Sequence, residues 1–164
     1  MTTSKVEAAD RIAASRAAND DSIPKARTGI IGFDEITGGG VPAGRTTLIV
    51  GGPGAGKTVF ALQGLVTAAR ELREPGIFVA FEENSRQIVA NASTFGWDLP
   101  ALEKERLFFL DARLGPTTIQ AGDFDISGIL AGLEAKVKEM KARRIVFDGI
   151  DVLLTLLDDP AKER

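Results

Sequence analysis

The sequence predicts an α/β fold in which a mostly parallel, doubly wound sheet is covered by helices on both faces. Three observations lead to this prediction. Short apolar, β-branched runs alternate with segments of helical periodicity, which is the pattern of strand–helix–strand units. The runs are apolar at nearly every position, as expected for strands that are buried on both sides. A glycine-rich octet at residues 51–58 lies between the first run and the first helical segment, where such sheets bind ligands.

The composition fits one globular domain and narrows the chemistry. The chain has 164 residues, 44% of them hydrophobic, and a formal net charge of −3. This acidic balance gives no support to a nucleic-acid or anionic-membrane surface. Cysteine and histidine are both absent from the sequence, which excludes disulfides, Ser-His-Asp or Cys-His catalysis and zinc centres built on those ligands. With no run of 18 apolar residues and no apolar signal core, we expect a cytoplasmic protein without a membrane partner.

Two regions are expected along the chain. Residues 1–26 are rich in alanine, carry mixed charges and hold few large apolar side chains, so we expect a flexible N-terminal arm. The folded α/β domain is expected over residues 27–164. It begins with a short helical turn near residues 29–36, and a glycine-rich connector at residues 38–42 leads into the first strand.

Four strands and three helices are expected after this connector. The strands are the apolar runs Thr46–Gly51, Ile77–Phe81, Leu107–Asp111 and Arg144–Asp148. The helices are the periodic segments at about residues 57–73, 85–95 and 126–141. Asn84 is expected to cap the second helix and Gly96 to end it, while Asp125 is placed to cap the third.

The octet reads Gly-Gly-Pro-Gly-Ala-Gly-Lys-Thr, a complete phosphate-binding loop of the Walker A type. Its glycines let successive backbone N–H groups turn toward phosphate oxygens, and the following helix N-terminus adds a partial positive charge. Lys57 is expected to reach the β- and γ-phosphates, and the Thr58 hydroxyl to ligate Mg²⁺. The predicted cofactors are therefore ATP and Mg²⁺, and the predicted binding residues are Gly52, Pro53, Gly54, Ala55, Gly56, Lys57 and Thr58.

An acidic residue ends or directly follows each of the three strands after the first. The last strand has the Walker B form, so Asp148 is expected to hold Mg²⁺, through a water, opposite Thr58. Glu82 and Glu83 directly follow the second strand and are the candidate catalytic residues that orient or deprotonate an attacking water. Adjacent residues of an extended chain point to opposite sides, so at most one of the two is expected to face the γ-phosphate. Asp111 is a weaker candidate for a supporting role.

Together these residues resemble the KaiC family of RecA-like P-loop ATPases. The resemblance runs from about Thr28 to about Leu157, and the paired glutamates and the Phe-Gly-Trp-Asp segment are more specific than the octet. The match is nearest to the first of the family's two tandem ATPase halves. The segments that carry it are Thr28-Gly29-Ile30, Gly32-Phe33-Asp34, Gly38–Gly40 with Pro42, the octet, Gly76–Val79, Phe81-Glu82-Glu83, Asn91, Phe95–Leu99 and Arg143–Asp148.

The resemblance implies a KaiC-like, circadian-clock-type ATPase that binds ATP and hydrolyses it slowly with Mg²⁺. It implies that Lys57 and Thr58 bind phosphate and Mg²⁺, that Glu82 and Glu83 are the catalytic acids, and that Asp148 is the Walker B residue. It also implies ATP-bridged homo-hexamers, clock-type partner proteins and, in full-length relatives, Ser/Thr autokinase activity. The chain ends soon after Walker B, so we expect a domain truncated at its C-terminus, without the Arg and Lys that the family supplies in trans.

Three alternatives fit the same residues. An ATP-dependent assembly module would bind ATP with negligible turnover, and phosphate release measured beside affinity separates it from an ATPase. A RecA-like DNA-binding recombinase is opposed by the acidic balance, and binding of single-stranded DNA at low salt tests it. A P-loop metabolite kinase needs an acceptor pocket, whereas the paired glutamates favour activation of water.

Overall fold

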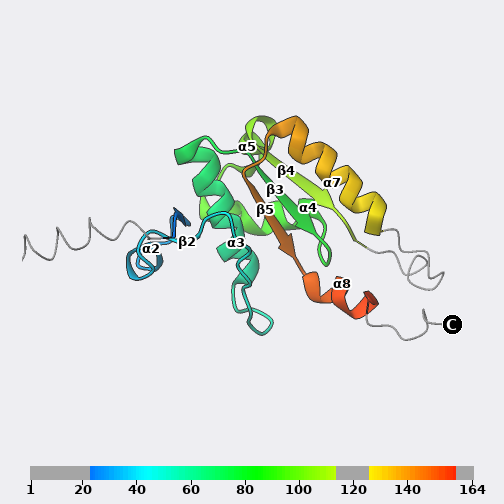
Figure 1. Ribbon diagram of the computed structural model, residues 1–164, viewed down its shortest axis with the longest axis horizontal. Helices are drawn as coiled ribbons and strands as arrows, with labels where there is room; N and C mark the ends of the chain where they lie inside the picture. The colour runs from blue at the N-terminus through cyan, green and yellow to red at the C-terminus, as the bar shows by residue number, and fades with distance from the viewer. Residues whose placement is uncertain (1–22, 114–125, 158–164) are drawn as a thin grey trace, which may run out of the picture.

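The computed structural model describes residues 23–113 and 126–157 of the chain. Within them a parallel sheet carries helices on both faces (Figure 1), which confirms the predicted α/β class. Only residues 23–26 of the expected arm fall in the described ranges. The cap expected at Asp125 lies outside them.

The sheet consists of β3 (Gly76–Ala80), β4 (Leu107–Asp111) and β5 (Arg144–Asp148), in the order β4-β3-β5. Both pairings are parallel, and Ala80 is in register with Asp111 on one side and with Asp148 on the other. The three strands therefore end at the same level. Residues that follow them share one edge of the sheet, where parallel sheets bind their ligands.

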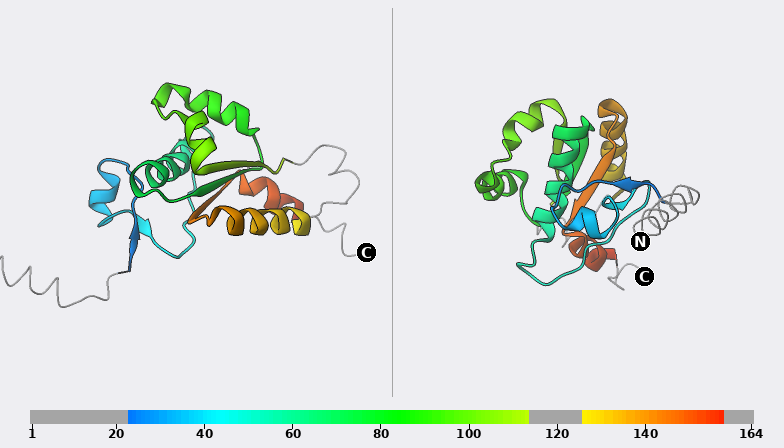
Figure 2. Two further views of the ribbon diagram at one scale, coloured as in Figure 1. Left: turned by 90° about the horizontal axis from the view of Figure 1, so that it is seen from above. Right: turned by 90° about the vertical axis from the view of Figure 1, so that its left-hand side faces the viewer.

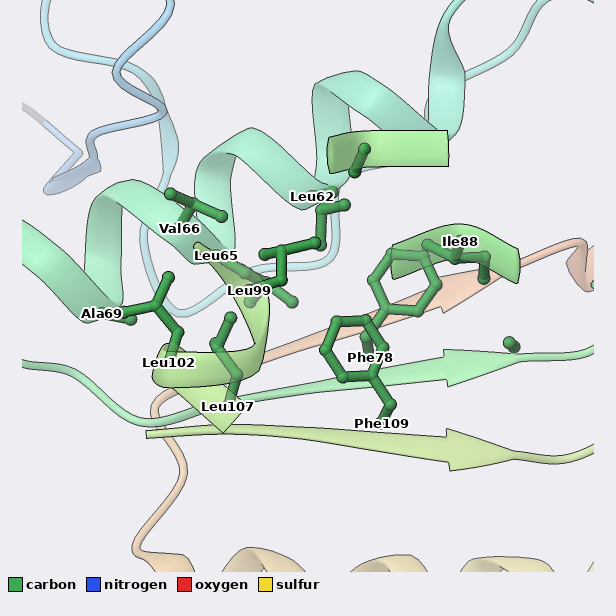
Figure 3. Packing of buried hydrophobic residues seen from close by; sticks show 12 residues of the cluster. Leu62, Leu65, Val66, Ala69, Phe78, Ile88, Leu99, Leu102, Leu107 and Phe109 are labelled. Atoms are coloured by element: carbon green, nitrogen blue, oxygen red, sulfur yellow. The ribbon is translucent and has the colours of Figure 1, made fainter. Parts of the chain in front are cut away.

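Side chains of β3 alternate between two cores. One core packs Phe78 against α3 (Lys57–Thr67), α4 (Ser85–Asn91) and α5 (Leu99–Glu105), with the Phe78 and Phe109 rings 5.6 Å apart (Figure 3). The opposite core packs Ile77 and Val79 against α7 (Ile126–Met140). The left view of Figure 2 shows α7 on the side of the sheet opposite α4 and α5. Cover on both faces explains why β3 is apolar throughout.

The helix boundaries follow the expected capping chemistry. The Asn84 side chain accepts the Gln87 N–H at 2.8 Å, and a 3₁₀ turn (Ala92–Phe95) continues α4 as far as Gly96, which has φ 68°. These two predicted roles are confirmed. Helix α3 continues into a π-helical turn (Ala68–Leu72), and α8 (Ile150–Leu157) follows β5.

A small N-terminal unit packs against α3. Strand β1 (Lys25–Ala26) pairs antiparallel with β2 (Val41–Pro42), and the predicted helical turn is α2 (Phe33–Ile36). The Thr67 hydroxyl donates to the Thr28 carbonyl at 3.0 Å, and the Gln63 side chain donates to the Gly29 carbonyl at 2.8 Å. These bonds attach the segment before the glycine loop to the helix after it.

The strand predicted at Thr46–Gly51 is wrong in this structure. Residues 46–50 are assigned to no strand and lie exposed, with Leu48 73% and Val50 83% accessible, in the trace that leads into α3 (Figure 1). Within the described ranges, β5 pairs only with β3, and Ile145 and Phe147 are 40% and 41% exposed. β-branched residues favour a strand only where pairing and burial are available, and here residues 46–50 have neither.

Candidate nucleotide and magnesium site

The glycine octet leads into the N-terminus of α3, as predicted. Gly56 immediately precedes the helix with φ 81°, in the left-handed region that favours glycine, and this turns the chain into the first helical residue. Helices α4 and α5 begin with capping side chains, Asn84 and Asp98, whereas no side chain caps α3. Among residues 23–113 and 126–157, no side chain therefore competes for the first N–H groups of α3, and such groups bind phosphate at helix N-termini.

Lys57 is folded back over this loop. Its ammonium donates to the carbonyl oxygens of Gly51 at 2.8 Å and Gly52 at 3.1 Å. Residues 51–56 are exposed while Lys57 is half-buried. The cation is thus held at the loop by two backbone carbonyl oxygens.

Thr58 and Asp148 meet although they are 90 positions apart in the sequence. The Thr58 hydroxyl lies 3.1 Å from Oδ1 and 3.0 Å from Oδ2 of Asp148. Burial raises the pKa of Asp148, and the charge of Asp151 adds to this; the hydrogen bond from Thr58 and the charge of Lys57 offset only part of the rise. Because burial disfavours the charged carboxylate, a cation placed beside it would be stabilising.

The donor set of this pair fits Mg²⁺. A hydroxyl and a carboxylate are hard oxygen ligands, the kind that Mg²⁺ prefers. Across residues 23–113 and 126–157, no cluster of three or more acidic, histidine or cysteine side chains offers a complete metal cage. Mg²⁺ at Thr58 and Asp148 would therefore take its other ligands from water and from nucleotide phosphates, as it does in most nucleotide sites.

The two candidate catalytic glutamates follow β3 at the same edge of the sheet, and both are exposed. The Phe81 N–H donates to the Asp148 carbonyl at 3.1 Å, which keeps the chain beside β5. Glu82 lies against Gly149, where an added Cβ would come within 2.9 Å of the Glu82 Cβ. The lack of a side chain at Gly149 leaves room for Glu82, and its φ of 73° independently favours glycine at this position. Glu83 is the next residue along this loop.

The contacts that two residues near the site make, Gly149 and Asp111, do not follow from the sequence. Gly149 was not singled out, although a glycine directly after the Walker B acid is a visible signal. Asp111 was expected only to support the site in general; its carboxylate accepts the Ser85 N–H at 2.6 Å and lies 3.3 Å from the Ser85 hydroxyl. No sequence pattern shows this contact, because it depends on the register of β4 against β3.

Comparison with known proteins agrees with this geometry. The family model described as "ATPase: KaiC" matches residues 26–164. The chain is 44% identical over 138 residues to the circadian clock oscillator protein KaiC of Parathermosynechococcus lividus, and 43% identical over 138 residues to that of Prochlorococcus marinus subsp. pastoris. It is 44% identical over 131 residues to the KaiC of Synechococcus elongatus.

These alignments cover most of this chain but a small part of each relative. They include 83%, 83% and 79% of this chain, and 26%, 27% and 25% of the three relatives. The chain therefore spans about a quarter of the length of the curated relatives it matches. In the part of the chain that the structure describes, no helix is both long and apolar enough to cross a bilayer.

Proposed function

The chain belongs to the KaiC family of ATPases, and we propose that it binds ATP with Mg²⁺ and hydrolyses the nucleotide slowly. The observation that carries the proposal is the meeting of the Thr58 hydroxyl with the Asp148 carboxylate, at 3.0 and 3.1 Å, beside the N-terminus of α3. Two oxygen ligands from distant parts of the sequence thus meet next to a loop that presents a lysine and backbone N–H groups.

Each residue of the loop has a role in this proposal. Lys57 exchanges the Gly51 and Gly52 carbonyls for β- and γ-phosphate oxygens, a charge-assisted contact in place of a neutral one. The backbone of Gly52, Pro53, Gly54, Ala55 and Gly56 surrounds the phosphates. Thr58 would ligate Mg²⁺, and Asp148 would hold it through a water. Mg²⁺ bound there supplies positive charge that neutralises the phosphates in the transition state.

Glu82 and Glu83 are proposed to orient the attacking water and to accept its proton. Glu82 packs against Gly149, which directly follows Asp148. This contact supports Glu82, rather than Glu83, as the acid nearer to the proposed Mg²⁺ position. Glu83, the next residue of the same exposed loop, stays in the proposal as the second candidate.

Family membership extends the proposal to the whole protein. We propose a homo-hexamer with ATP between subunits and with clock-type partner proteins, because the relatives are circadian clock oscillator proteins by name. Ser/Thr autokinase activity is proposed only for full-length relatives. Such sites gain from a positive group supplied by the neighbouring subunit, an effect on the order of 10³–10⁵ in rate in related systems.

The test measures ATP affinity by calorimetry and phosphate release on the same preparations. Lys57→Ala should lose ATP affinity, while Lys104→Ala, which changes an exposed lysine on α5, should not. Glu82→Gln combined with Glu83→Gln should keep ATP bound and stop phosphate release, and the single variants rank the two acids. Unchanged affinity in Lys57→Ala contradicts the binding site. ATP binding without phosphate release in the wild type favours the assembly-module alternative.

A further inference from the structure

We propose that Asp111 is a positioning residue for hydrolysis, because its carboxylate fixes the loop that carries Glu82 and Glu83. The inference rests on the proposed ATPase function and assigns to that site a residue that does not touch nucleotide. The loop runs from Phe81 to Asn84, between the end of β3 and the start of α4.

The contact that fixes the loop is short and charge-assisted. Asp111 Oδ1 accepts the backbone N–H of Ser85 at 2.6 Å, and Oδ2 lies 3.3 Å from the Ser85 hydroxyl. Hydrogen bonds to a carboxylate are shorter and stronger than those between neutral groups. Ser85 is the first residue of α4, so this bond sets where the loop ends.

The loop is attached to the sheet on both sides. At its start, the Phe81 N–H donates to the Asp148 carbonyl of β5, and Glu82 lies against Gly149. At its end, Ser85 is held by Asp111 of β4. Strands β4 and β5 flank β3 on opposite sides. The loop therefore crosses the carboxyl edge of the sheet, with its start bound to β5 and its end bound to β4. Loss of either attachment frees the glutamates to shift relative to Asp148.

The hydrogen bond between Ser85 and Asp111 positions the loop more than it stabilises the fold. Asp111 and its contacts with Ser85 are exposed, so water can replace the carboxylate at the Ser85 N–H and no buried donor is left unsatisfied. Helix α4 already has its own cap, since Asn84 accepts the Gln87 N–H at 2.8 Å. Catalytic geometry is far more sensitive, because a misplacement of about 1 Å can cost on the order of 100-fold in rate.

Ser85→Pro is a matched partner for Asp111→Ala, because it removes the donor of the same bond. Proline is favoured at the first position of a helix. Asn84 already has φ −79° and ψ 151°, the extended backbone that a following proline requires. Asp111→Asn keeps an acceptor without the charge. Glu103→Ala, on the exposed side of α5, is the control.

Two readouts decide the proposal: steady-state phosphate release with ATP affinity, and amide hydrogen exchange over residues 82–88 without nucleotide. Asp111→Ala and Ser85→Pro should each speed exchange in that segment and lower turnover by about 10- to 100-fold with unchanged ATP affinity. The double variant should be no worse than either single variant, because both remove one bond. Asp111→Asn should recover part of the turnover, and Glu103→Ala should change neither readout.

Unchanged exchange and unchanged turnover in Asp111→Ala overturn the proposal. Faster exchange throughout β3 as well as in the loop also overturns it, because Asp111 would then act only on stability. A wild-type protein that binds ATP but releases no phosphate overturns the proposed hydrolysis and, with it, the catalytic purpose of the contact. In that case the exchange data alone still show whether Asp111 holds the loop.

Discussion

The Asp34 carboxylate organises the turn that leads toward the phosphate-binding loop. It accepts the Thr28 hydroxyl at 2.7 Å, the Thr28 N–H at 3.1 Å and the Gly29 N–H at 2.9 Å. Burial raises the pKa of Asp34, but these hydrogen bonds and the charge of Arg27 outweigh it, so the pKa lies below its ordinary value. The carbonyls of Thr28 and Gly29 are then presented to α3, which makes Asp34 the centre of this small unit.

Asp34→Asn should therefore destabilise the protein by about 1–3 kcal/mol at neutral pH, the worth of hydrogen bonds to a charged group. A carboxylate with a depressed folded-state pKa contributes fully above the unfolded value of 3.8. This contribution is lost as pH falls through the folded value. Denaturant unfolding at pH 7 and at steps below pH 4 should show the difference from wild type shrinking. A difference that does not depend on pH would contradict the role of charge, and Glu35→Gln on the exposed side of α2 is the control.

The secondary-structure elements divide into those that local pattern determines and those that need tertiary context. Continuous apolar runs predicted β3, β4 and β5 within one residue; β3 is buried throughout, whereas Ile145 and Phe147 of β5 are 40% and 41% exposed. The run at residues 46–50 has the same local character, but its side chains find no core and the prediction failed. Helix α5 was missed because its seven residues are too few to show a clear period, although Asp98 and Pro100 mark its start.

This division can be tested by comparing two leucines. Leu65 on α3 is 1% exposed, whereas Leu48 is 73% exposed. Leu65→Ala should cost about 2–5 kcal/mol of unfolding free energy as a buried cavity, and Leu48→Ala should cost less than about 0.5 kcal/mol as a surface change. Chemical denaturation without nucleotide measures both. An equal cost for Leu48→Ala would mean that residues 46–50 pair with the sheet in solution.

At the scale of the whole molecule, the sequence identifies the residues of the candidate site but not their spatial relations. The octet identifies Lys57 and Thr58, and the Walker B pattern identifies Asp148. Both motifs can be recognised because each is one continuous stretch of sequence. Contacts between Asp111 and Ser85, or between Glu82 and Gly149, depend on strand register and on which loops share an edge. The sequence alone shows neither the strand register nor which loops lie at the same edge of the sheet.

The surface of the described residues predicts association of the 164-residue chain. Ile31 is 95% exposed, Ile36 85% and Leu154 54%, besides the outer edge of β5. Exposed apolar area and an unpaired strand edge favour self-association. We therefore expect a mass that rises with protein concentration. Light scattering across a range of concentrations checks this, and the same mass at every concentration would contradict it.

The most direct measurement of the central claim is the Mg²⁺-dependent part of the stabilisation by ATP. Thermal unfolding is followed with ATP in EDTA and with ATP in excess Mg²⁺, for the wild type, Thr58→Ala and Asp148→Asn. A ligand that binds only the folded state raises the unfolding temperature, and at a fixed ligand concentration the increase is larger for tighter binding. If Thr58 and Asp148 hold the metal, the wild type gains a further increment with Mg²⁺, while both variants keep the increment in EDTA and lose the further one. Equal Mg²⁺-dependent increments in all three proteins would contradict a magnesium-nucleotide site at this pair.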